Sequence, residues 1–97
     1  MNNTLKAGSK AYWLTHNSGH IPCVVEHVRD TKEHTSGMTF DLSRHGVSSR
    51  YIAFIRLTAD RGPYRKGERM EVFAHDVAPR NCVRRSGAVW AFMVEVG

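Results

Sequence analysis

The side chains of this sequence that could hold a metal ion are six histidines and two cysteines. Zinc sites bring such residues together in closely spaced pairs. Two pairs have a spacing of four here: His16 with His20, which flank an Asn-Ser-Gly turn, and Cys23 with His27. On a strand, residues four apart point the same way but lie about 13 Å apart, too far to share one ion without a bend. The spacing therefore predicts neither a metal site nor a bound cofactor.

Catalysis by a cysteine would need a thiolate paired with a base. Cys23 with His27, or Cys82 with His75, offers such a pair, but neither lies in a recognisable local signature and no third, orienting group is identified. Exposed ion pairs with neighbouring arginines are the expected role of three nearby carboxylates, Glu68, Glu71 and Asp76. The sequence therefore predicts that this protein is not an enzyme and works by binding.

The segment of residues 60–67 combines cations with one aromatic ring. It has no apolar periodicity, so we predict a surface loop with a tight turn at Gly62-Pro63. Nucleic-acid-binding proteins use cations to follow the phosphates and a ring to stack on a base. The same composition also suits a solvated hairpin turn whose charges prevent edge aggregation. The residues concerned are Arg61, Tyr64, Arg65 and Lys66.

The net charge of +5 is concentrated in the second half of the chain. Residues 50–97 carry nine Lys or Arg against five Asp or Glu, and eight of the nine are arginine. Arginine's planar fork suits phosphates and carboxylates, so the bias indicates an acidic partner. Arg80, Arg84 and Arg85 form a second basic cluster, just after Pro79. If this cluster shared one face with the loop of residues 60–67, the patch would hold about six cations and bind nucleic acid with strong salt dependence. The further candidate binding residues are Arg69, Arg80, Arg84 and Arg85.

A length of 97 residues predicts a single domain over residues 1–97. The hydrophobic fraction of 41% and the charged fraction of 24% are typical of a globular protein and argue against global disorder. No apolar run approaches the roughly 18 residues of a membrane span, and the first residues lack the apolar stretch of a secretory signal. We therefore expect a cytoplasmic protein without a membrane partner, in which Cys23 and Cys82 are reduced, buried and inert.

Short apolar runs separated by glycine-rich and polar turns predict an all-β fold. Strands are expected over residues 10–15, 21–28, 51–58, 70–74 and 87–96, with a weaker one over 38–42. A single 3₁₀ turn is expected between Ala74 and Arg80. Because Tyr12 and Trp13 are adjacent on a strand, one should face the core and the other solvent. The expected core residues are Val25, Phe54, Val72, Trp90 and Phe92, with Trp90→Ala costing about 3–5 kcal/mol.

This order of parts resembles the SH3-like small β-barrel of the Tudor or KOW type. The resemblance rests on a glycine-led start over residues 5–8, the aromatic pair at 12–13, a turn with Gly19, and a valine-rich strand. It also rests on a 3₁₀ turn ending at Pro79-Arg80 before a closing strand. The resemblance implies a barrel of five or six short strands with an elaborated loop around residues 30–49. That loop and the stretch 81–96 are both longer than is usual in such barrels.

Three binding functions fit this sequence. The preferred one is a nucleic-acid-binding module with little sequence specificity. An alternative is a small protein-interaction or inhibitor module, of the kind that a phage or other mobile element encodes, docking on an acidic protein surface. The resemblance to Tudor barrels implies a third, an aromatic cage for a methylated side chain. That cage needs three or four converging rings, and outside the core only Tyr12 or Trp13, Tyr51 and Tyr64 are available. No oligomeric state is predicted.

Overall fold

The computed structural model describes residues 4–31, 38–41 and 51–97. Within these ranges the chain is mostly β, as predicted, and its only helical segments are two short 3₁₀ turns. No helix in these ranges is long and apolar enough to cross a bilayer. The elements in chain order are β1 (Thr4–Leu5), β2 (Lys10–Leu14), β3 (His20–Asp30), β4 (Met38–Asp41), β5 (Tyr51–Leu57), β6 (Arg69–Phe73), η1 (Ala74–Asp76), β7 (Val77–Pro79), η2 (Arg80–Cys82) and β8 (Phe92–Glu95).

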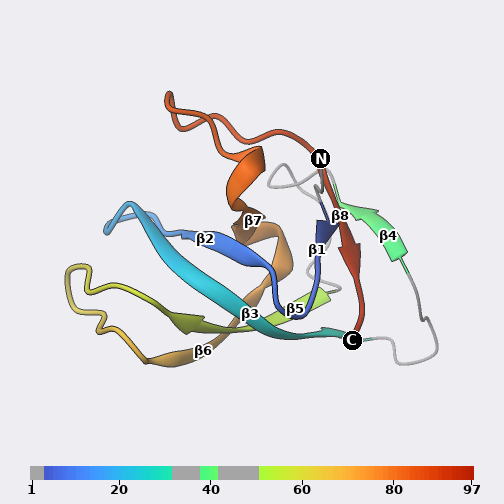
Figure 1. Cartoon of the computed structure of the whole chain (residues 1–97), viewed down its shortest axis with the longest axis horizontal. Coiled ribbons are helices and arrows are strands. Elements are labelled where there is room, and N and C mark those ends of the chain that lie inside the picture. Colours follow the sequence, from blue (N-terminus) through green and yellow to red (C-terminus); the bar gives the residue numbers. More distant parts are fainter. Residues whose placement is uncertain (1–3, 32–37, 42–50) are drawn as a thin grey trace.

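Five strands form one antiparallel sheet in the order β6-β5-β3-β2-β7 (Figure 1). The turn between β2 and β3 uses Gly19 with a φ of 69°, a conformation that glycine adopts without a steric penalty. β5, which is rich in apolar residues, lies inside the sheet between β3 and β6. This sheet carries most of the side chains discussed below.

The remaining strands form a second sheet in the order β1-β8-β4, in which β8 runs parallel to β1 and antiparallel to β4. The two sheets are linked through β3. The first half of β3 pairs with β2, whereas further along Val28 exchanges two 2.9 Å backbone hydrogen bonds with Gly97, just beyond β8. One core is therefore shared by both sheets: Leu5 and Phe92 come from the smaller sheet, and Ile21 and Ile55 from the larger.

A β-bulge at Glu26 interrupts the alternation of β3. Val25 pairs with Ile55 and His27 with Phe54, so Glu26 is the extra residue. Buried and exposed positions alternate up to Val25, then Glu26 and His27 are both exposed, and Val28 is buried again. Without the extra residue, the period of two would turn the Val28 side chain to the outer face of the sheet. The bulge therefore keeps both halves of β3 facing the core.

The structure shows a mostly β domain but does not show the predicted closed barrel, because neither sheet closes among the described residues. The 3₁₀ turn occurs as predicted, but the strand after it is β7, which pairs with β2 and was missed. β7 has only three residues and ends in a proline, so its sequence cannot be distinguished from a continuation of the preceding 3₁₀ turn. The expected closing strand over 87–96 begins only at Phe92 and belongs to the second sheet. Residues 32–37 and 42–50 of the predicted elaborated loop lie outside the described residues, and its middle forms β4.

The prediction that Trp90 is a core residue is wrong: 53% of its surface is exposed. Val25 and Phe92 are buried as predicted, whereas Phe54 and Val72 are only half-buried. Trp90 precedes β8, and its backbone N–H donates a 2.8 Å hydrogen bond to the Cys82 carbonyl. Because Trp90 lies before the first residue of β8, the alternation of buried and exposed side chains in that strand does not extend to the Trp90 side chain.

We predict opposite outcomes for two aromatic substitutions near the chain's end. Phe92→Ala should lower the free energy of unfolding by about 3–5 kcal/mol, because it empties a fully buried site. Trp90→Ala should lower it by about 1 kcal/mol or less, the scale of an exposed cation–π contact. Urea denaturation followed by circular dichroism measures both values. Equal losses would contradict the exposed placement of Trp90.

Candidate nucleic-acid interface

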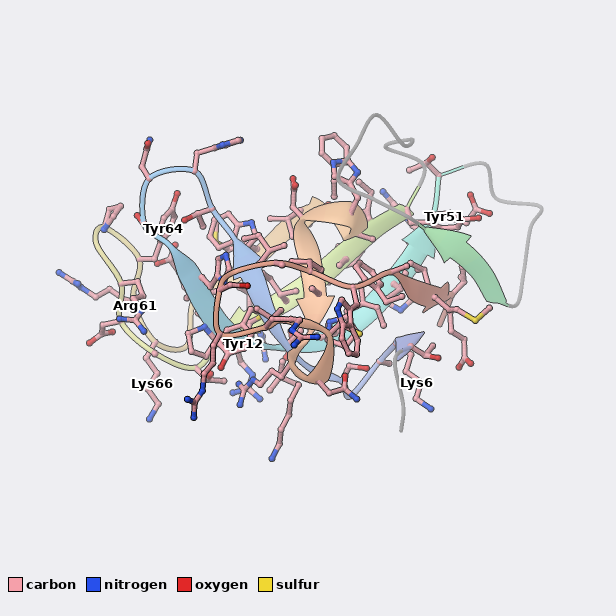
Figure 2. All side chains as sticks on the ribbon, turned by 90° about the horizontal axis from the view of Figure 1, so that it is seen from above. Lys6, Tyr12, Tyr51, Arg61, Tyr64 and Lys66 are labelled. Carbon is pink, nitrogen blue, oxygen red and sulfur yellow. The ribbon has the colours of Figure 1, made fainter. Side chains whose placement is uncertain are left out.

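The loop between β5 and β6 is held by backbone hydrogen bonds and by its two carboxylates. Leu57 and Glu68 pair at its base, and Arg61 and Tyr64 exchange bonds of 2.9 and 2.8 Å around the Gly62-Pro63 turn. The two carboxylates of the loop accept from amides: Asp60 Oδ1 from the Lys66 N–H at 2.7 Å, and Glu68 Oε1 from the Arg65 N–H at 2.9 Å. Both carboxylates therefore stabilise the loop's backbone, and Arg61 and Lys66 extend from its tip (Figure 2).

Tyr64 anchors this loop to the fold. Its half-buried ring packs edge-on against Trp13, with 4.9 Å between centroids and 70° between planes. Gly62, at a φ of 52°, lies against the β2–β3 turn: a Cβ at Gly62 would come 2.9 Å from Ser18 Oγ. Tyr64 thus positions the cations around it, while Arg61, Arg65 and Lys66 remain exposed.

The second predicted basic cluster forms a tight turn over residues 84–88. The Arg84 N–H donates to the Ala88 carbonyl at 2.8 Å, and the Gly87 N–H donates to the Arg84 carbonyl at 2.9 Å. The Arg84 guanidinium lies over the exposed Trp90 ring, 4.7 Å from its centroid. Arg85 is exposed at the turn. Gly87 lies beside His20, because a Cβ at this position would be 4.0 Å from the His20 Cε1 atom.

Arg80 lies between the two clusters. Its Nε donates to the Ala11 carbonyl at 3.3 Å, and its Nη2 lies 3.5 Å from Thr58 Oγ1 at the start of the β5–β6 loop. The guanidinium carbon is also 5.5 Å from the centroid of the Tyr12 ring. Arg80 is therefore held on three sides and links β2 to the loop that carries Arg61.

Both basic segments contact the β2–β3 turn region, one through Ser18 and the other through His20. Figure 1 shows that turn beside the β5–β6 loop at one end of the sheet, with the segment after η2 rising above it. Residues 58–69 and 80–90 together contain seven Lys or Arg and two carboxylates. Their net charge of +5 equals that of the whole chain, so the rest of the chain is neutral in sum.

Arg69, the remaining predicted site residue, belongs to a different group. Its Nε lies 3.3 Å from Glu26 Oε1, and the other oxygen of this carboxylate lies 3.4 Å from the Arg56 Nε. Arg56 on β5 is the direct cross-strand partner of Arg69 on β6. On its other side Arg56 pairs with Val24 on β3, and Val24 pairs with Lys10 on β2. Four strands thus place Lys10, Arg56 and Arg69 in one row.

This row lies on the face of the five-stranded sheet that points away from the core, and we call it the outer face. The alternation of β5 identifies it, because Ile52, Phe54 and Arg56 are half-exposed while their neighbours are buried. The sequence prediction missed Lys10 and Arg56 as site residues. Only the consecutive polar residues Glu26-His27 inside an apolar run hinted at the bulge that sets this register.

Neither cysteine is suited to act as a nucleophile. Cys23 and Cys82 are both buried and free, as predicted. Burial raises the pKa of the Cys23 thiol from 9.0 to about 12, against the opposing effect of the nearby Arg80 charge. Burial also raises the pKa of the Cys82 thiol. Since the thiolate is the reactive form, both groups are inert near neutral pH.

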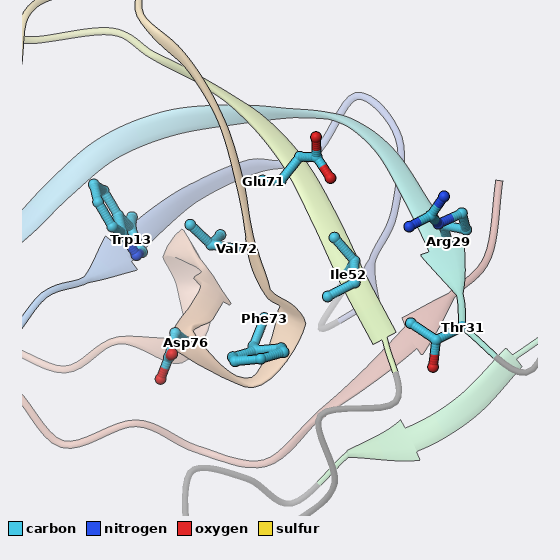
Figure 3. Close-up of a pocket in the computed structure, with 8 residues that line it drawn as sticks. All are labelled: Trp13, Arg29, Thr31, Ile52, Glu71, Val72, Phe73 and Asp76. Atoms are coloured by element: carbon cyan, nitrogen blue, oxygen red, sulfur yellow. The ribbon is translucent and has the colours of Figure 1, made fainter.

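A hollow of about 520 Å³ lies away from both basic clusters (Figure 3). Its apolar lining is formed by Ile52, Val72 and Phe73, with Arg29 beyond Ile52 and Asp76 near the opposite end. None of the eight predicted binding residues lines it. Among the described residues, no group of three or more His, Cys, Asp or Glu side chains is placed to hold a metal ion.

No family model matches the chain, and no curated protein or solved structure is detectably similar to it. Functional assignment therefore rests on the chain's own residues.

We predict that both thiols are protected in the folded protein. At pH 8 a thiol reagent such as dithionitrobenzoate should label neither cysteine in native buffer and both in about 8 M urea, because only unfolding exposes them. Absorbance of the released thionitrobenzoate reports the labelling. Rapid labelling of one cysteine in native buffer would contradict its burial.

The raised pKa of Cys23 also predicts a loss of stability in alkali. The unfolded chain releases this proton near pH 9, whereas the folded chain holds it to about pH 12. Stability is therefore fully present below pH 9 and declines above it, by up to about 1.4 kcal/mol per pH unit for this group. Urea denaturation between pH 8 and 11 should give a shallower decline for Cys23→Ala, although this variant is less stable throughout. An equally steep decline in both proteins would contradict the assignment.

Proposed function

We propose that this protein binds nucleic acid through the cations of residues 58–69 and 80–90, with little sequence specificity and without catalysis. The observation that supports this most is that two segments hold a net charge equal to that of the whole chain and lie beside the same β2–β3 hairpin, one near Ser18 and the other near His20. Concentrated arginine charge attracts phosphates at long range and releases counterions on contact.

The state of the charged groups also favours phosphate binding. Within the described residues, the ion pairs of the five-stranded sheet involve Arg56 and Arg69, and none involves Arg61, Lys66, Arg84 or Arg85. The loop's own carboxylates are occupied by backbone amides. Among the described residues, a phosphate would therefore meet exposed cations without first having to displace a carboxylate from them.

We further propose that the larger sheet is related to SH3-like barrels and that the protein works in the cytoplasm. A 3₁₀ turn followed by a short strand that returns to the first strand of the sheet supports the first point. Two unpaired, buried cysteines suit a reducing compartment.

Binding should depend steeply on salt. The affinity for mixed-sequence oligonucleotides, measured by fluorescence anisotropy, should fall by orders of magnitude between about 50 and 200 mM salt. Arg65→Ala with Lys66→Ala should flatten the plot of log affinity against log salt by roughly two units, because two phosphate contacts are lost. The double variant should unfold like the parent. Absence of binding at 50 mM salt would overturn the proposal.

Lys6 provides a matched control for charge. It lies far from Arg61 and Lys66 in Figure 2, next to β1. Lys66→Ala should flatten the salt dependence by about one unit, whereas Lys6→Ala should leave the slope unchanged. Equal effects would show that net charge alone, and not the loop, governs binding.

One observation favours an acidic protein as a second candidate partner. Trp90 and Arg84 form an exposed stacked pair, and tryptophan and arginine are the residues that most often dominate protein interfaces. Such a complex would have a fixed stoichiometry, survive moderate salt and be lost in Trp90→Ala. If oligonucleotide binding is weakened by Lys66→Ala but unchanged by Trp90→Ala, nucleic acid is favoured over an acidic protein as the partner.

A further inference from the structure

The outer face of the larger sheet carries rings as well as charges. Antiparallel sheets commonly turn one polar face to water. Here two half-buried rings lie on that face, Phe54 on β5 and Tyr12 on β2, each two residues from the row of Lys10, Arg56 and Arg69. The row separates the two rings. The face also carries two carboxylates: Glu26, which pairs with Arg56 and Arg69, and Glu71, the cross-strand partner of Phe54.

Each ring is also flanked by a further cation or an imidazole. The Arg29 guanidinium lies 5.8 Å from the Phe54 centroid, and the His27 ring lies 5.4 Å from it. On the other side of the row, Arg80 lies 5.5 Å from the Tyr12 centroid. Planar cations over aromatic rings form the kind of surface that binds unpaired bases.

We propose that this outer face binds a single-stranded nucleic acid, with phosphates on Lys10, Arg56 and Arg69 and bases stacked on Phe54 and Tyr12. The inference rests on the proposed function, and it specifies both the form of nucleic acid and a second surface. Bases stack on protein rings only when they are unpaired, whereas a duplex presents mainly its phosphates to such a face.

The spacing of the row suits a chain that crosses the strands. Neighbouring strands lie about 4.8 Å apart, so the three spacings from Lys10 to Arg69 span about 14 Å. Hollows of about 250 and 200 Å³ lie at its two ends, the first bordered by Lys10 and Arg80, and the second by Phe54 and Arg69 together with the carboxylates Glu26 and Glu71. Phosphates and bases therefore both find room along one path.

The Glu26 carboxylate already occupies the position beside the two arginines that a phosphate would take. The bulge turns this extra side chain outward, and its two oxygens lie 3.4 and 3.3 Å from the Nε atoms of Arg56 and Arg69. An arriving phosphate must displace this carboxylate or share the arginines with it. Glu26 therefore weakens binding on this face, and removing its charge should strengthen it.

The first test compares a labelled mixed-sequence 15-mer with its duplex at about 100 mM salt, by fluorescence anisotropy. The parent protein should bind the single strand more tightly. Phe54→Leu keeps an apolar side chain but removes the ring, and should weaken single-strand binding about tenfold while leaving duplex binding unchanged. The matched control is Phe73→Leu. This exposed ring on β6, opposite Ile52 and stacked on His75, lies on the same face but is not one of the proposed stacking positions, so its loss should change binding less than twofold.

The second test uses charge. Glu26→Gln should tighten single-strand binding several-fold, whereas Glu95→Gln, which removes the same charge from the smaller sheet, should have a much smaller effect. Arg56→Gln should flatten the single-strand salt dependence by about 0.7 units, the value for one lost phosphate contact. Urea denaturation checks that each variant is folded.

The outcomes separate this inference from the proposed function. Binding of neither form by the parent protein would overturn both. Single-strand binding that depends on Lys66 but is unchanged by Phe54→Leu, Arg56→Gln and Glu26→Gln would overturn the outer-face site and leave the loop interface standing. Preference for the duplex would also overturn it.

Discussion

The bulge at Glu26 in β3 is the constraint on which both the core and the outer face depend. β3 bonds to β5 along one edge and, on the other, first to β2 and then to Gly97 beyond β8. A strand that serves both sheets must bend, and an extra residue bends it while keeping Val25 and Val28 inside. The same residue is the one whose carboxylate meets Arg56 and Arg69. One local irregularity therefore joins packing to surface chemistry.

The charged residues of this chain divide according to what holds them. Carboxylates of the β5–β6 loop bind amides and fix its backbone, which leaves the neighbouring cations exposed. Arg80 is instead fixed by Ala11, Thr58 and Tyr12, so it is a preorganised cation between the loop and the outer face. Arg80 contacts both Thr58, at the start of the loop, and Tyr12, on the outer face. The two proposed binding surfaces are therefore adjacent at Arg80.

Short apolar runs and the turn residues between them were enough to predict β2, β3, β5, β6 and a 3₁₀ turn after Phe73. Two failures have a common cause. Trp90 was assigned to the core by extending the alternation of β8 backwards, although the turn over residues 84–88 and the Trp90–Cys82 hydrogen bond keep that segment out of the strand. β7 was missed because three residues with a proline show no period at all. The row of Lys10, Arg56 and Arg69 was not predictable either. These residues are far apart in the sequence, and only the pairing register of four strands brings them together.

The energetics of the outer face favour exchange of its anion. Exposed ion pairs contribute at most about 1 kcal/mol each, and Glu26, Arg56 and Arg69 all keep at least a third of their side-chain surface in water. Displacing the Glu26 carboxylate therefore costs little stability, and a phosphate bound as proposed would meet two arginines on the adjacent strands β5 and β6. Because the affinity of a polyanion falls as salt rises, the proposed exchange of Glu26 for a phosphate is expected to be favoured at low salt and disfavoured at high salt.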